Sequence, residues 1–169
     1  LLYLHGGGWL VGDKGTQGLP LCNHLAKLGW VCVNANYRLS PAATWPDHLV
    51  DAKAAVAWMR EHADEYGIDP DFIAVAGGSA GGHLCSLLAL TENKYQDVLQ
   101  PGFEDADTSV QGCLSQYGVY DFCGQNPEVA EFSFQLLNNC FVEASLGTGH
   151  RINSIRKLKY NIIMKIYKI

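Results

Sequence analysis

Short apolar runs alternate with amphipathic segments along most of the chain. Four runs rich in aliphatic, β-branched or aromatic residues predict strands over 1–4, 30–37, 72–77 and 110–119. Apolar residues at helical spacing predict helices over 18–28, 47–66 and 80–90, and a further one is expected over 127–142. Strands that alternate with helices at this spacing form parallel βαβ units. We therefore expect an α/β fold with a mostly parallel central sheet and helices on both of its faces.

The ends and faces of these helices can also be predicted. Gly29 is expected to end the first helix, because glycine readily adopts the left-handed conformation that follows a helix. Asp47 is placed to cap the second helix. The buried face of that helix is expected to carry Val50, Ala54, Ala57 and Trp58.

Composition indicates one globular domain, and the charge pattern divides the chain. The protein has 169 residues, of which 48% are hydrophobic and 17% charged, with a net charge of −5. Every acidic residue lies at or before Glu143, whereas 151–169 carries only basic charges. We expect a folded core over 1–146 and a basic tail over 147–169.

The basic tail is not expected to supply a strand, because its apolar residues keep no sustained period of two. Its composition resembles translation past a splice site or in a shifted frame, and an amphipathic segment at a membrane surface is the alternative. Since Leu1 is not an initiator methionine, we expect the chain to be a piece of a longer protein.

The six cysteines are scattered without a C-x-x-C pair and mostly have apolar neighbours. Buried free thiols are the expectation, with a zinc site or a disulfide as alternatives. The cysteines are Cys22, Cys32, Cys85, Cys113, Cys123 and Cys140. Together with the absence of an N-x-S/T sequon, this pattern leans towards an intracellular, reducing setting.

One serine lies between glycines where a strand gives way to a helix. Residues 77–81 read Gly-Gly-Ser-Ala-Gly, which satisfies the G-x-S-x-G pattern of a nucleophile elbow with Ser79 at its centre. A glycine-rich turn that binds phosphate is the alternative. The sequence lacks both the Lys-Ser/Thr pair of a phosphate loop and a G-x-G-x-x-G motif, so the nucleophile is favoured.

A second glycine cluster, His5-Gly6-Gly7-Gly8-Trp9, follows the first strand. Backbone N–H groups of such a loop can stabilise the tetrahedral oxyanion of acyl transfer. The carboxyl ends of parallel strands meet at one edge of a sheet, so we expect this loop and the elbow to share a crevice. His5 precedes the serine in the chain and is expected to hold the loop rather than act as a base.

These motifs resemble the hormone-sensitive-lipase-like group of α/β-hydrolases. The matching stretches are HGGGWLVGD, NANYRLSP, GIDPDFIAVAGGSAGGHL and YGVYDF, in the order of the family and within residues 1–146. Gly78 stands where many relatives have aspartate. The resemblance implies that Ser79 is the nucleophile and that the N–H groups of Gly7, Gly8 and Ala80 form the oxyanion hole. It also implies structural support from His5, Gly6, Gly77 and Gly81.

The same resemblance implies a small-molecule ester substrate, no metal or organic cofactor, and no nucleic-acid partner. It further implies an Asp or Glu and then a His after strands beyond YGVYDF. Asp121 follows the wrong strand, His83 lies on the helix after the elbow, and His150 follows no strand. We therefore expect the base to be absent from residues 1–169 and this chain to be nearly inactive. A small-molecule-binding relative without catalysis and an amide-cleaving deacetylase remain alternatives.

Overall fold

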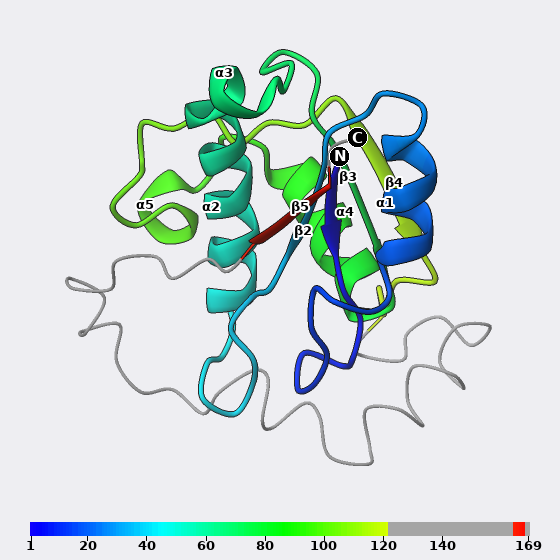
Figure 1. Ribbon diagram of the computed structural model, residues 1–169. Coiled ribbons are helices and arrows are strands. Elements are labelled where there is room, and N and C mark those ends of the chain that lie inside the picture. Colours follow the sequence, from blue (N-terminus) through cyan, green and yellow to red (C-terminus); the bar gives the residue numbers. More distant parts are fainter. Residues whose placement is uncertain (122–163, 168–169) are drawn as a thin grey trace.

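The computed structural model describes residues 1–121 and the backbone of 164–167. Five strands in these residues form one sheet in the order β4-β3-β1-β2-β5 (Figure 1). They are β1 (Leu2–Leu4), β2 (Cys32–Ala35), β3 (Ala74–Gly78), β4 (Gly112–Gln116) and β5 (Met164–Tyr167). Neighbours among the first four strands run parallel, whereas β5 pairs antiparallel with β2. The predicted parallel sheet is confirmed.

Helices cover both faces of this sheet. They are α1 (Leu19–Ala26), α2 (Asp47–Glu61), α3 (Ala63–Tyr66), α4 (Ala80–Thr91) and α5 (Gln96–Leu99). Leu2 and Leu4 of β1 join the core that α2 and α4 cover, while Tyr3 packs in the second core with Cys22 of α1. Alternate residues of β1 thus enter opposite cores, as the period of a strand requires. Figure 1 shows α1 on one side of the strands and α2 on the other.

The predicted second helix is divided in two. His62 interrupts it between α2 and α3, and its Nδ1 lies 3.0 Å from the carbonyl oxygen of Trp58, one turn back. Asp47 is the first helical residue rather than the cap, a position that Pro46 takes. Burial also extends further round α2 than predicted, since Lys53 is fully buried. Ala57 and Trp58, which are expected on the buried face, are only partly buried. Packing against both α4 and α5 explains this wider burial.

The expectation that the basic tail supplies no strand is wrong for residues 164–167. β5 pairs with all four residues of β2, from Cys32 opposite Tyr167 to Ala35 opposite Met164. β2 is buried along its whole length, so its outer edge would otherwise leave backbone polar groups without partners. A run of four residues is enough to satisfy this edge, although it is too short to show a sustained period in the sequence.

The remaining expectations concern the cysteines and the additional helices, and some of them fall on residues that the structure does not describe. Cys22, Cys32 and Cys85 are buried free thiols, as expected, but Cys113 is exposed. The short helix α5 was not predicted. The expected helix over 127–142, together with Cys123, Cys140 and His150, lies outside the described residues. Within the described residues, no helix combines the length and the apolar character needed to cross a membrane.

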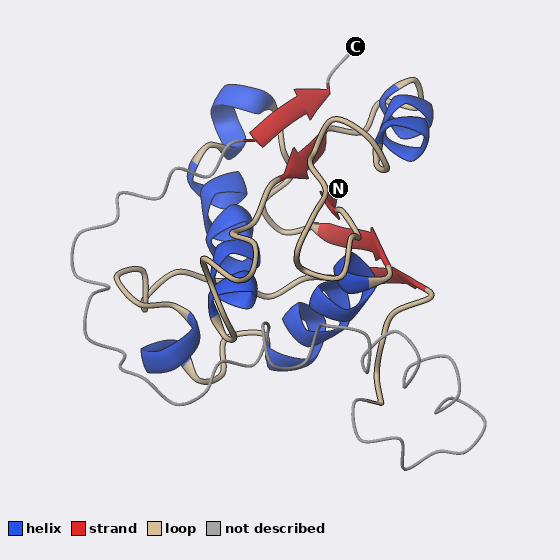
Figure 2. Cartoon of the chain, turned by 90° about the horizontal axis from the view of Figure 1, so that it is seen from below, coloured by secondary structure: helices blue, strands red, loops and turns tan. Residues whose placement is uncertain are grey.

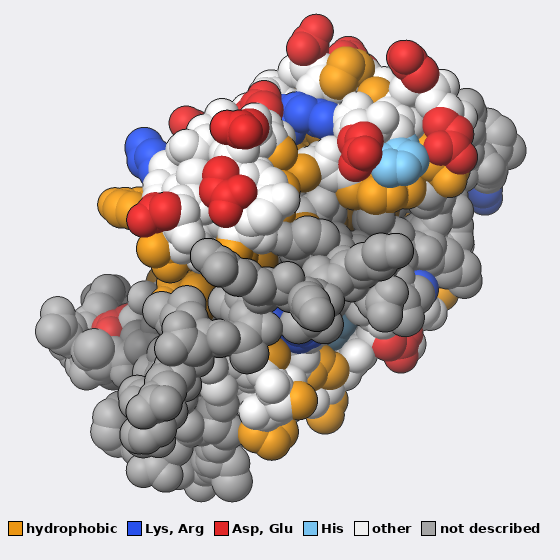
Figure 3. Space-filling view, turned by 90° about the vertical axis from the view of Figure 1, so that its left-hand side faces the viewer, with side chains coloured by type: hydrophobic (Ala, Val, Ile, Leu, Met, Phe, Trp, Pro, Cys, Tyr) orange, Lys and Arg blue, Asp and Glu red, His pale blue; other side chains and the backbone are white. Residues whose placement is uncertain are grey.

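Acidic side chains gather on the face that carries α2, α3 and α5. Figure 3 views the side of the molecule that carries α2, α3 and α5, and Asp and Glu gather over its upper part. Asp64 and Glu65 of α3 and Asp97 of α5 are all exposed. Exposed carboxylates on this face therefore contribute to the net negative charge of the protein.

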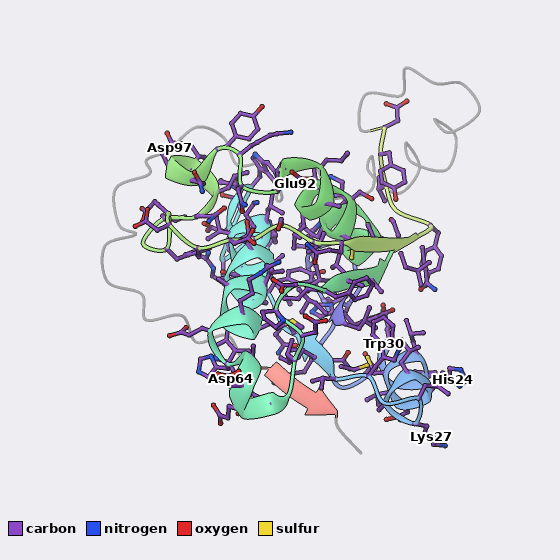
Figure 4. The ribbon with its side chains drawn as sticks, turned by 90° about the horizontal axis from the view of Figure 1, so that it is seen from above. His24, Lys27, Trp30, Asp64, Glu92 and Asp97 are labelled. Atoms are coloured by element: carbon purple, nitrogen blue, oxygen red, sulfur yellow. The ribbon has the colours of Figure 1, made fainter. Side chains whose placement is uncertain are left out.

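A buried lysine joins α2 to the segment that follows α4. Lys53 Nζ donates to the carbonyl oxygen of Glu92 and to Thr108 Oγ1, the latter at 3.1 Å. Thr108 Oγ1 lies 2.9 Å from both the Glu92 carbonyl oxygen and Gln100 Oε1. Glu92 is the C-cap residue that follows α4, and Figure 4 labels it. Burial lowers the pKa of Lys53 to about 8, because an ammonium group is poorly solvated there.

Replacing this lysine should change how stability depends on pH. Between the folded pKa near 8 and the ordinary value of 10.5, the unfolded chain binds more protons at Lys53, so the stability contributed by this group rises with pH. In this pH window, the free energy of unfolding of the wild type should rise by on the order of 1 kcal/mol per pH unit relative to that of Lys53→Met. Urea unfolding from pH 7 to 10 measures this, with the exposed Lys94→Met as control. Equal pH slopes for Lys53→Met and wild type would contradict the prediction.

Candidate active site

Ser79 occupies a strained turn between β3 and α4. Its φ of 55° and ψ of −117° lie outside the regions that serine ordinarily adopts. The Ser79 N–H donates to the carbonyl oxygen of Gln116 at the end of β4, over 2.9 Å. The carbonyl oxygen of Ser79 accepts from the His83 N–H of the first turn of α4, over 3.0 Å. Hydrogen bonds on both sides therefore hold the strained residue, which stays half-buried.

The glycines around Ser79 are needed because the elbow touches bare backbone. A Cβ on Gly81 would lie 2.1 Å from the carbonyl oxygen of Leu4, and one on Gly77 would lie 2.6 Å from the same atom. Both distances are well below any real contact of a Cβ. α4 can therefore leave the elbow across the end of β1 only if these two positions carry no side chain.

The sheet register brings the glycine loop beside the serine. Leu4 of β1 pairs with Gly77 of β3, so the residues that follow the two strands lie level with each other. A Cβ on Gly6 would meet the Gly78 carbonyl oxygen at 2.7 Å and the Ser79 Cβ at 3.3 Å. The loop and the elbow are thus in direct contact at the carboxyl ends of the strands. Figure 2 looks onto this end of the sheet, where the connecting loops face the viewer.

Hydrogen bonds in the loop set the direction of two backbone N–H groups. The carbonyl oxygen of Gly6 accepts from His5 Nδ1 at 2.8 Å, and that of Gly7 accepts from the Leu10 and Val11 N–H groups at 3.1 Å. In a trans peptide the C=O and the following N–H point in opposite directions. The N–H groups of Gly7 and Gly8 therefore point away from these bonds.

Two further features suit this loop and elbow to binding an anion. Gly7 and Gly8 have φ values of 123° and 59°, which favour glycine. Ala80 is the first residue of α4, and the N–H groups of a first helical turn have no partner within the helix. The positive end of the helix dipole lies there as well.

His5 is buried beneath the loop. Its ring stacks on Tyr37 with centroids 4.4 Å apart, and burial lowers its pKa. Because a carbonyl oxygen can only accept, Nδ1 carries the proton in the bond to Gly6. Nε2 is buried and has no hydrogen-bond partner among the described residues. His5 thus holds the loop and does not contact Ser79 through a hydrogen bond.

The His83 ring packs against Trp9. Its ring meets Trp9 edge-on at 5.3 Å, and burial, with a smaller effect of His48, lowers its pKa to about 4. Within residues 1–121 no hydrogen bond joins a histidine ring to the Ser79 hydroxyl. Asp121 lies beyond the end of β4, and His150 is outside the described residues.

The structure also shows contacts that the motifs alone did not reveal. Gln17 Oε1 accepts from the Gly6 N–H at 2.8 Å, and the Tyr37 hydroxyl donates to the His5 carbonyl oxygen at 2.8 Å. Tyr37 lies in the NANYRLSP stretch, whereas no motif marked Gln17. Within the described part of the chain, no cluster of three or more His, Cys, Asp or Glu side chains could hold a metal ion.

A strained serine elbow after one parallel strand, in contact with a glycine loop after the next, defines an α/β-hydrolase core. The chain belongs to the BD-FAE family, whose sequence model matches residues 1–151.

Comparisons with individual proteins agree with this assignment. Over 122 residues, 72% of the chain, it is 59% identical to "Probable carboxylic ester hydrolase LipM" of Mycobacterium tuberculosis. It is 37% identical over 102 residues, 58% of the chain, to arylacetamide deacetylase of Oryctolagus cuniculus. The butyrate-bound structure of the esterase Est2 from Thermogutta terrifontis superposes with a TM-score of 0.64 at 29% identity, covering 74% of this chain and 44% of that one.

The matches are partial in length. The chain spans 28% of LipM and 26% of the deacetylase. The similarity to the hormone-sensitive-lipase-like esterases is therefore shown for the part that carries the elbow and the glycine loop.

Alanine at position 81 should disrupt the packing between α4 and β1. We expect Gly81→Ala to lower the free energy of unfolding by about 3 kcal/mol, because the Leu4 carbonyl belongs to a central strand and cannot move freely. Gly112→Ala is the matched control, since its Cβ would meet the Ala74 Cβ at 3.3 Å and the Ala74 Cα at an ordinary contact distance of 4.0 Å. Urea denaturation of both variants is the measurement, and equal effects would contradict the backbone-contact argument.

Proposed function

We propose that the protein is a serine carboxylic-ester hydrolase that forms an acyl-enzyme on Ser79. The observation that carries the proposal is the close approach of the elbow and the glycine loop, where a Cβ added to Gly6 would lie 3.3 Å from the Ser79 Cβ. This contact supports the proposal, because the N–H groups of Gly7 and Gly8 in the same loop point away from the hydrogen bonds that its carbonyl oxygens accept. A nucleophile next to prearranged donors is the arrangement that acyl transfer requires.

In the proposed reaction, Ser79 Oγ attacks the carbonyl carbon of an ester while a base takes the hydroxyl proton. The carbonyl oxygen becomes an oxyanion, which the N–H groups of Gly7, Gly8 and Ala80 stabilise by about 3–4 kcal/mol per donor. The C–O bond to the alcohol then breaks, and the alcohol leaves with the proton. Water attacks the acyl-enzyme in the same way, which releases the carboxylic acid and restores Ser79.

The base in this proposal comes from outside residues 1–121. No histidine ring in that range is hydrogen-bonded to the Ser79 hydroxyl, and burial of the His83 ring lowers its pKa to about 4. The acidic partner of the base is likewise assigned to residues beyond this range.

Two alternatives have specific support. Within residues 1–121 no histidine ring is hydrogen-bonded to the Ser79 hydroxyl, as expected of a small-molecule-binding relative without catalysis. The similarity to a protein named arylacetamide deacetylase favours amide cleavage by the same serine and the same donors. The two differ in what they predict, since only the deacetylase turns substrate over.

Removing the Ser79 hydroxyl should abolish ester hydrolysis. In the full-length gene product, Ser79→Ala should lower kcat for p-nitrophenyl butyrate by about 10³-fold or more, because no acyl-enzyme can form without the hydroxyl. Ser86→Ala is the matched control on the same helix, because Ser86 Oγ donates to the Gly82 carbonyl oxygen at 3.1 Å and lies outside the proposed machinery. Thermal melting of both variants checks the fold.

The outcomes separate the three functions. Ser79-dependent turnover of the ester supports the hydrolase, and turnover that is faster for the matching anilide supports the deacetylase. Tight binding of an ester without turnover would replace both with the binding protein.

The position of the base can be tested by comparing two lengths of chain. We expect residues 1–169 to react with a fluorophosphonate on the order of 10³-fold more slowly than the full-length gene product, because an unassisted serine is a weak nucleophile. Labelling rates followed by mass spectrometry measure this. Equal, Ser79-dependent rates would place the base within residues 122–169, with His150 the first residue to replace.

A further inference from the structure

We propose that Gln17, together with Tyr37, positions the oxyanion-hole donors by holding the His5–Gly6 peptide at both ends. Gln17 is a positioning residue in this proposal and does not touch the substrate. The inference rests on the proposed function and adds to it the residues that fix the geometry of the glycine loop.

The His5–Gly6 peptide is held in two opposite directions. Its carbonyl oxygen accepts from the Tyr37 hydroxyl at 2.8 Å, and its N–H donates to Gln17 Oε1 at 2.8 Å. Because the peptide is planar, two hydrogen bonds on opposite edges fix its rotation about the chain. The next peptide is then fixed by His5 Nδ1, which donates to the Gly6 carbonyl oxygen. The direction of the Gly7 N–H is the direct consequence.

The bond to Gln17 also decides which N–H groups can serve the reaction. The Gly6 N–H already has an acceptor in Gln17, so it is not available to an oxyanion. Neither Gly7 nor Gly8 donates its N–H to a protein acceptor within residues 1–121. The Gly6 N–H therefore has a structural role, whereas the N–H groups of Gly7 and Gly8 remain available to an oxyanion.

The loop that carries Gln17 is anchored to the sheet. It lies before α1, and the backbone of Lys14 in that loop is bound by Asn34 of β2 and by Asn36, which directly follows β2. Asn34 Nδ2 donates to the Lys14 carbonyl oxygen at 3.0 Å, and Asn36 Oδ1 accepts from the Lys14 N–H at 2.6 Å. Asn34 is fully buried on β2. Gln17 therefore reaches Gly6 from a loop whose position is set by β2.

Gln17 and Gly6 differ in burial, so a substitution at Gln17 can test the role of this hydrogen bond without removing core packing. Gln17 is exposed, so replacing it removes no core packing. Gly6 is buried, and its N–H would lose its acceptor and the orientation that the acceptor provides. A change at Gln17 should consequently alter the loop geometry much more than the global stability.

The test compares four forms of the full-length gene product: wild type, Gln17→Leu, Tyr37→Phe and the double variant. Gln17→Leu should lower kcat for p-nitrophenyl butyrate by about 10- to 100-fold and change KM by less than about threefold. Misaligned donors stabilise the transition state less well, whereas binding of the ester itself depends little on them. A trifluoromethyl ketone, which forms an oxyanion on Ser79, should lose affinity in parallel with kcat. The double variant should lose less than the product of the two single losses, because both bonds hold one peptide.

Thr16→Val is the matched control in the same loop, because Thr16 Oγ1 donates only to the Asp13 carbonyl oxygen. Its kcat and melting temperature should equal those of the wild type. A Gln17→Leu enzyme that keeps wild-type kcat, or one that loses kcat only through a lower melting temperature, overturns the role of Gln17 and leaves the proposed function intact. A wild type without Ser79-dependent turnover overturns the proposed function, and this role with it.

Discussion

The contact between the main chain of the elbow and the end of β1 is the constraint on which the site depends. Gly77 and Gly81 both face the Leu4 carbonyl oxygen, with no room for a side chain at either position. The relative position of Ser79 and the glycine loop is therefore set by the distance between two backbones. Side chains can repack when one of them changes, but backbone atoms of adjacent strands cannot. The site accordingly inherits the rigidity of the central sheet.

Local features of the site could be predicted from the sequence, whereas contacts between distant segments could not. The elbow and the loop are short motifs whose glycines reflect the space available, so their pairing at one end of the sheet follows from the parallel topology. The role of Gln17 depends on a loop that folds back across β2, and no local pattern marks it. The burial of Lys53 likewise arises from segments that reach it from beyond α4. β5 was missed because its pairing is with a strand far away in the sequence.

Burial gives the region beneath the glycine loop an apolar character despite its histidines. His5, His48 and His83 are all held in surroundings that lower their pKa, chiefly by desolvation. Since electrostatic interactions are stronger where water is excluded, the oxyanion of the proposed reaction would interact with the proposed N–H donors more strongly than in solution.

The pairing of β5 with β2 has a consequence for the order in which the sheet can assemble. The two strands are separated by about 130 residues, whereas β1, β2 and β3 follow one another closely in the chain. Closing so long a loop carries a larger entropic cost than forming the nearby pairs, and such contacts form late. During synthesis, β2 would therefore emerge and pair with β1 while its other edge still waited for β5. In that interval the exposed edge is a site where another chain could add a strand, so a chaperone or rapid completion of synthesis would favour the native pairing.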